Sequence, residues 1–221
     1  MTMAATTRRR IACFCEKVFE AELPSVVDLA ARPEAADEVL RGEFMAVSCP
    51  ACGKRLTPEF PCRFTGVAAG SLGALDIELV PEAERVAFLA GRLGRDLRRP
   101  DRVVIGVPEL AEKLAIFRAG LDDRAVEVLK FLLVSRPARD GAPSPAGGRE
   151  VAVTFRGAEG GQLVFHIAGL REGEVAVARP DRSLYDRIVA DLANRLAEEP
   201  FRDFCEPPYV SLRRVEQESA S

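Results

Sequence analysis

Four cysteines in the N-terminal part of the chain have the residue type and spacing of a metal site. Cys13 and Cys15 flank a single residue, Cys49 and Cys52 flank two, and Gly53 follows the second pair. Thiolates from two tight turns can converge tetrahedrally on Zn²⁺, and a glycine after a pair helps its turn to close. The spacing therefore predicts a structural zinc site with Cys13, Cys15, Cys49 and Cys52 as ligands.

Other interpretations of these cysteines stay open. The first pair is one residue shorter than the second, and Glu16 stands where a glycine would ease the turn. The four residues could instead be buried thiols, or the remnant of a site that has lost its metal. A redox role for Cys49 and Cys52 would need a thioredoxin-like βαβ context, which their flanking sequence lacks.

No other residue shows the pattern of a catalytic site. Cys62 and Cys205 are interpreted as small buried hydrophobic residues, although Cys62 could serve as a spare ligand. His166, the only histidine, is expected on a strand, on the face opposite the apolar residues around it. The adjacent Asp122 and Asp123 are explained by capping of a helix. We assign no catalytic or cofactor-binding residue other than the metal ligands.

The elements that must position the cysteines are short strands around one helix. Alternation of Phe19, Ala21 and Leu23 with glutamates predicts a half-buried strand after the first cysteine pair. The remaining predicted elements of this module are a strand at 9–15, a helix at 33–41, a strand at 44–48 and its return at 56–60.

The rest of the chain predicts a helical hairpin followed by a β-meander. Leu110, Leu114 and Phe117 recur at helical spacing, as do Val126 and Leu129, and Gly120 lies between the two sets. The other predicted elements are a linker at 66–73, a strand at 75–79, a helix at 81–97, a flexible loop at 137–148, strands at 151–155, 163–167 and 175–177, a helix at 183–196 capped by Asp181 or Ser183, and a last strand within 201–215.

These elements predict an α+β fold in three parts. An N-terminal zinc-ribbon-like module spans 9–65, a strand and helical region spans 74–136, and an antiparallel β-meander with a helix spans 149–215. No apolar run approaches the ~20 residues that cross a bilayer, and the apolar stretch from Ile11 to Cys15 is too short for the apolar region of a signal peptide. We therefore expect a cytoplasmic protein, whose reducing surroundings favour metal binding over disulfides.

The net charge of −3 argues against non-specific attachment to nucleic acid or anionic membranes. Residues 1–65 hold nine Lys and Arg against nine Asp and Glu, without the positive surplus typical of a ribbon that grips nucleic acid. A protein is thus the expected partner, and nucleic acid is not. The sequence indicates no substrate and no oligomeric state.

The segment from Ile11 to about Thr65 resembles the CpXC family of bacterial and archaeal proteins, and four stretches carry the resemblance. They are the Cys13-Phe14-Cys15 start, the strand from Glu16 to Ala21, the helix from Pro33 to Gly42 and the segment from Ser48 to Gly53. The second of the family's two Cys-Pro-X-Cys motifs is intact here, and the first lacks its proline and one spacer residue. Pro108 to Leu133 also resembles the region that follows in family members. The resemblance implies a zinc-binding module and adds no catalytic residue.

Together these observations favour a non-enzymatic, metal-stabilised binding or scaffold protein with Zn²⁺ as a structural cofactor. Two alternatives stay open. One is a nucleic-acid-associated zinc ribbon, which salt-dependent binding of DNA or RNA would favour. The other is an enzyme whose acid and base residues converge only in three dimensions, which a deep pocket with perturbed carboxylates would favour.

Overall fold

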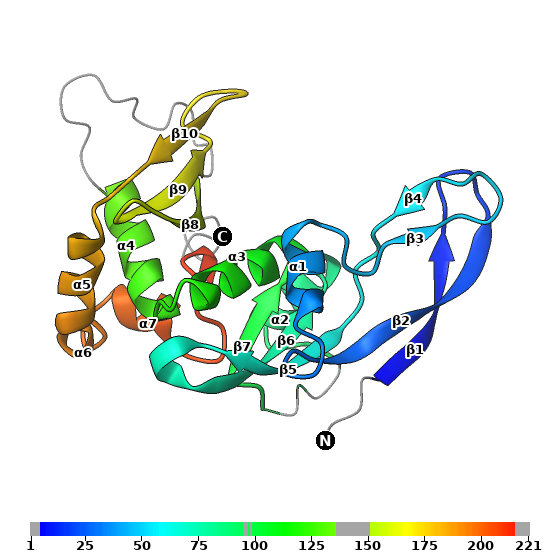
Figure 1. The fold of residues 1–221 in the computed structure, drawn as a ribbon, viewed down its shortest axis with the longest axis horizontal. Coiled ribbons are helices and arrows are strands. Elements are labelled where there is room, and N and C mark those ends of the chain that lie inside the picture. Colours follow the sequence, from blue (N-terminus) through cyan, green and yellow to red (C-terminus); the bar gives the residue numbers. More distant parts are fainter. Residues whose placement is uncertain (1–4, 95–96, 98, 136–150, 215–221) are drawn as a thin grey trace. The chain divides into compact units, whose positions relative to one another are not determined.

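The computed structural model describes residues 5–94, 97, 99–135 and 151–214 (Figure 1). It has mixed α and β structure, as predicted, and divides into two compact units. Unit 1 comprises Met1–Ala68 and Gly73–Leu114, and unit 2 comprises Ala69–Leu72 and Ala115–Ser221. These units do not coincide with the three predicted segments, because one sheet joins strands from the first two. The predicted loop at 137–148 lies outside the described residues.

A five-stranded mixed sheet is the frame of unit 1, in the order β1-β2-β5-β6-β7. Its antiparallel pairs are β1 with β2 and β5 with β6, whereas β2 with β5 and β6 with β7 are parallel. The strands are β1 (Ala5–Ala12), β2 (Val18–Asp28), β5 (Cys62–Ala68), β6 (Ala74–Val80) and β7 (Arg102–Ile105).

The parallel pairing of β2 with β5 requires a long crossover connection. That connection holds helix α1 (Glu34–Leu40) and the two-stranded ribbon of β3 (Val47–Ser48) and β4 (Arg55–Leu56). The predicted helix at 33–41 is confirmed. The predicted strands at 44–48 and 56–60 are present only as these short pieces, because the chain turns at Met45 (φ 58°) and returns to the main sheet after Phe60.

The predicted linker at 66–73 is wrong. Strand β5 runs to Ala68, and a 3-10 turn covers Gly70–Leu72. The register shifts between Phe64 and Val67, and Gly66 lies in this bulge with φ +67°. A β-bulge uses a glycine for its conformation, so the glycine that suggested a linker marks an irregularity inside a strand.

Strand β6 confirms the predicted strand at 75–79, whereas the helix predicted at 81–97 is much shorter. Pro81 leads into a 3-10 turn (Glu82–Glu84) and the short helix α2 (Arg85–Leu89), and the chain leaves the helix at Gly91, with φ +64°. Val86 is 70% exposed, so α2 lacks the continuous buried apolar face that would stabilise a longer helix.

Strand β7 was not predicted. All its residues are buried, so no alternation of apolar and polar residues marks it.

The helical hairpin is confirmed as α3 (Gly106–Arg118) and α4 (Asp123–Ser135), with Gly120 between them at φ +68°. The boundary between the units falls within α3. In unit 2, α4 packs against strand β8 and helices α5 and α7. Leu129 is fully buried on α4, and Leu132 is only half-buried.

The predicted meander is confirmed as an antiparallel sheet in the order β10-β9-β8. Its strands are β8 (Ala152–Glu159), β9 (Gln162–Ala168) and β10 (Val175–Ala178). One face buries Phe155 and Phe165, whose ring centroids lie 5.5 Å apart. His166 is half-buried on the opposite face, as predicted.

The C-terminal part of unit 2 differs from the prediction. Asp181 is the N-cap of α5 (Arg182–Ala190). The helix predicted at 183–196 is interrupted after Ala190 and continues as α6 (Leu192–Arg195). The strand predicted within 201–215 is wrong, because Phe201–Cys205 forms helix α7. Pro207 and Pro208 follow this helix, and neither has the backbone N–H group that would donate a hydrogen bond within a sheet. Further along, the Leu212 N–H donates to buried Glu127 at 2.9 Å.

Candidate metal centre

The two cysteine turns meet at one end of unit 1 (Figure 1). Cys13 and Cys15 lie in the turn between β1 and β2, and Cys49 and Cys52 lie in the turn between β3 and β4. The Sγ atoms of Cys13 and Cys52 are 3.6 Å apart, and those of Cys15 and Cys49 are 3.7 Å apart. All four sulfurs lie within 4.8 Å of one another, so the structure brings together the predicted ligands.

The backbone closes both turns in the same way. In the first, Cys13 N–H donates to the Lys17 carbonyl and Glu16 N–H to the Cys13 carbonyl, each at 2.9 Å. In the second, Cys49 N–H donates to the Lys54 carbonyl and Gly53 N–H to the Cys49 carbonyl, also at 2.9 Å. The residue after each cysteine pair adopts a left-handed backbone conformation, with φ of 66° at Glu16 and 71° at Gly53. The shorter first turn therefore reaches a similar geometry without glycine.

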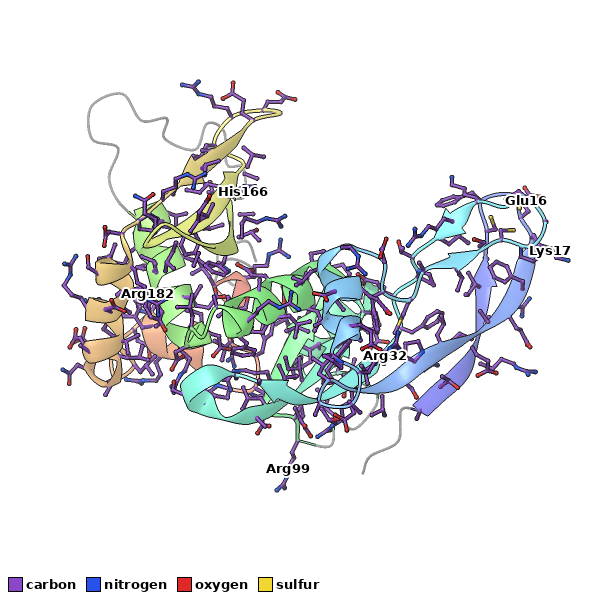
Figure 2. All side chains as sticks on the ribbon, viewed as in Figure 1. Glu16, Lys17, Arg32, Arg99, His166 and Arg182 are labelled. Carbon is purple, nitrogen blue, oxygen red and sulfur yellow. The ribbon has the colours of Figure 1, made fainter. Side chains whose placement is uncertain are left out.

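Each turn presents one buried and one exposed sulfur-bearing residue. Cys13 and Cys49 are 6% and 2% exposed, whereas Cys15 and Cys52 are exposed. The sulfurs gather between the two turns, and Glu16 and Lys17 lie at the outer end of the hairpin (Figure 2). The hairpin tip thus holds a half-shielded cluster that is open to solvent on one side.

The surroundings of the cluster favour ionisation of the Cys49 thiol and oppose ionisation of the Cys52 thiol. Burial opposes ionisation of Cys49, but the backbone N–H groups of Cys52 and Ala51, together with the neighbouring thiols, lower its pKa to about 6. The backbone N–H of Lys54 favours the Cys52 thiolate, yet the other thiols and burial raise the pKa of Cys52 to about 11. A cation among the sulfurs would remove this mutual opposition.

The donor set and its spacing could hold a metal ion, and Zn²⁺ gives the reference geometry for four thiolates. Four sulfurs placed tetrahedrally at ~2.3 Å from one ion lie about 3.8 Å from each other. The two measured separations of 3.6 and 3.7 Å agree with that value. Within the described parts of the chain, no other group of histidine, cysteine and acidic side chains gathers closely enough to hold a metal ion.

The remaining candidates are not members of this cysteine cluster. Cys62 is 1% exposed on β5, and its pKa is raised to about 12 by burial and by the charge of Glu78. Cys205 is buried, and its thiol lies 3.6 Å from the carbonyl oxygen of Arg124. Asp122 accepts hydrogen bonds from the backbone and side chain of Arg124 at the start of α4. These contacts support the structural interpretation of all three residues.

The structure adds two features of the tip to the prediction. Glu16, which stands where a glycine would ease the turn, adopts the left-handed conformation that Gly53 adopts in the other turn. The Lys54 ammonium lies 4.3 Å from the centroid of the Phe14 ring, and Phe14 is 82% exposed. No local pattern links residues 14 and 54, because only the meeting of the turns brings them together.

Comparisons with known proteins agree with this geometry. A family model described as CpXC protein matches residues 11–130. An uncharacterized protein of Treponema pallidum (strain Nichols) is 32% identical over 197 residues, covering 81% of this chain and 86% of that protein. No solved structure matches the chain. Among the described residues, the helices are all too short or too polar to cross a membrane.

Proposed function

This chain belongs to the CpXC family, and we propose that it is a non-enzymatic binding or scaffold protein stabilised by one structural Zn²⁺. The convergence of Cys13, Cys15, Cys49 and Cys52 carries this proposal. When bound, the ion supplies charge neutralisation and a cross-link between two turns. Four thiolates fill a tetrahedral site, so no position stays open for a catalytic water.

The position of the cluster supports a role in folding. Among the described residues, β1 and β2 pair only with each other from Ala5 to Leu23, and β3 pairs only with β4. Two-stranded ribbons are marginally stable alone in water. A metal shared by their turns would therefore stabilise both ribbons. We infer that the partner is another protein, which contacts the surface of the two cysteine turns that the metal holds in place.

Metal analysis of the purified full-length chain tests the proposal. We expect about one zinc per chain. Substitution with Co²⁺ should give the absorption bands of tetrahedral thiolate coordination. Cys15→Ser should weaken metal retention against a competing chelator, whereas Cys205→Ala should not. A chain that is folded but contains no zinc, or a Co²⁺ spectrum with oxygen or nitrogen ligands, would contradict the assignment.

A further inference from the structure

We propose that the tip of the paired cysteine turns is a docking surface for an acidic protein segment, with Phe14 as its anchor. The tip surface is defined by its exposed residues Phe14, Lys17, Val18, Pro50, Ala51 and Lys54. This inference deepens the proposed function, because it rests on metal-fixed turns and names the class of partner that they bind.

Phe14 has the properties of an interface anchor. Its side chain is 82% exposed, the highest fraction among the exposed large hydrophobic residues in the described chain. It lies between Cys13 and Cys15, whose sulfurs are tied to the opposite turn. An aromatic side chain on a rigid turn loses little conformational entropy on binding, which is why such residues recur as hot spots.

Further apolar surface lies beside this ring. Val18 is 40% exposed at the start of β2, and Pro50 and Ala51 are exposed between the cysteines of the second turn. Because the two turns share one sulfur cluster, these residues lie at the same end of unit 1 as Phe14. The surface is small, so we expect a weak and rapidly exchanging contact.

The charges on the tip favour an acidic partner, because the exposed Lys17 and Lys54 outnumber the exposed Glu16. The Lys54 ammonium is placed over the Phe14 ring at 4.3 Å, and Lys17 is exposed in the first turn. Among the described residues, neither lysine forms an ion pair. Carboxylates that flank an apolar side chain would pair with these lysines while the apolar group covers Phe14.

The neighbouring arginines favour protein over nucleic acid. Arg8 pairs with Glu20 and Glu22 across the hairpin, at 3.6 and 3.2 Å. The Arg9 guanidinium lies 5.2 Å from the centroid of the Phe60 ring. A phosphate backbone would need a continuous row of available cations. Arg8 and Arg9 of the strand next to the tip are instead already engaged within the protein.

The proposal is tested by selecting a phage-displayed library of random peptides for binding to the zinc-loaded full-length chain. We expect enrichment of sequences with Asp or Glu around a large apolar residue. For a synthetic selected peptide, Phe14→Ala should weaken binding at least about tenfold in fluorescence anisotropy. Lys54→Gln should weaken it several-fold, with a smaller effect at high salt. Replacing Asp and Glu of the peptide by Asn and Gln should weaken binding to a similar extent.

Val86→Ala and Arg92→Gln are matched controls, because both residues are exposed in unit 1 outside the tip. Their affinities should equal that of the native chain. An absence of acidic enrichment, or equal binding by Phe14→Ala, overturns the docking surface. Phe14-dependent binding of oligo-uridine, without binding of acidic peptides, overturns the partner class. Zinc content is measured in every variant, so failure of the metal assignment is distinguished from failure of the docking surface.

Discussion

At the scale of single residues, the two turns place the same demand on different side chains. Glu16 and Gly53 both follow a cysteine pair and both have positive φ. For an L-residue this conformation costs roughly 1–2 kcal/mol, and glycine avoids that cost. A Cβ added at Gly53 would meet no atom within 4 Å, so backbone conformation alone decides the effect of a substitution there.

Substitutions at these two positions should have asymmetric effects. Gly53→Ala should lower the free energy of unfolding of the Co²⁺-substituted tip by about 1–2 kcal/mol. Glu16→Gly should cause no loss, because relief of the strained conformation offsets the greater freedom of glycine in the unfolded chain. Denaturant unfolding followed through the Co²⁺ bands measures both. A loss of more than ~1 kcal/mol in Glu16→Gly would show that the Glu16 side chain makes a contribution that its backbone angle does not explain.

At the scale of elements, the hairpin of β1 and β2 joins the rest of the sheet over a short stretch. Only Val26–Asp28 of β2 pairs with Arg63–Thr65 of β5. The sheet then continues through β6 and β7, which contain the fully buried Ile77, Leu79 and Ile105. We therefore expect a metal held by the cysteine cluster and the buried sheet to stabilise different parts of unit 1.

Removal of one ligand should unfold the outer part of unit 1 and spare the inner sheet. In Cys49→Ser we expect loss of hydrogen-exchange protection over residues 5–23 and 43–56, and retained protection in β5, β6 and β7. Hydrogen exchange with mass spectrometry resolves these regions. Cys62→Ala is the control, because it removes a buried thiol outside the cluster and should retain zinc. Loss of protection throughout 9–65 would instead support the predicted N-terminal module as one folding unit.

At the scale of the whole molecule, each unit has its own core. Unit 1 is built on the five-stranded sheet, and unit 2 is built around α4, the meander and α7. In unit 2, Leu129 is fully buried, and the buried Glu127 carboxylate is held by Lys130 at 3.0 Å and by the Leu212 N–H at 2.9 Å. The segment around Leu212 is therefore part of the second core.

Destabilising each core separately should affect separate parts of the chain. Leu129→Ala should cost unit 2 about 2–5 kcal/mol, because it leaves a cavity in a fully buried site. Val134→Ala on the same helix, at a 36% exposed position, should change stability by less than about 0.5 kcal/mol. Hydrogen exchange should localise the Leu129→Ala effect to residues 115–214, with zinc retained. Equal loss of protection in β5 and β6 would show that the units unfold together.

The sequence alone determined the features that depend on local pattern. The cysteine pairs, the strand around Ile77, the helical hairpin at Gly120 and the meander follow from spacing and periodicity, and the structure contains all of them. The resemblance to the CpXC family rests on the matching motifs, and the family model that matches residues 11–130 confirms it. Helical and strand periods are properties of neighbouring residues, so they can be recognised without knowledge of the fold.

Only the tertiary structure decided the features that depend on distant residues. The parallel pairing of β2 with β5 places the second cysteine turn in a crossover connection, and it brings Lys54 over Phe14. Strand β7 has no alternation because it is buried on both faces, and α2 stops early because no surface covers Val86. Phe204 enters the core of unit 2 from a helix instead of a strand. Burial and long-range pairing set these outcomes, and neither is encoded in the spacing of adjacent residues.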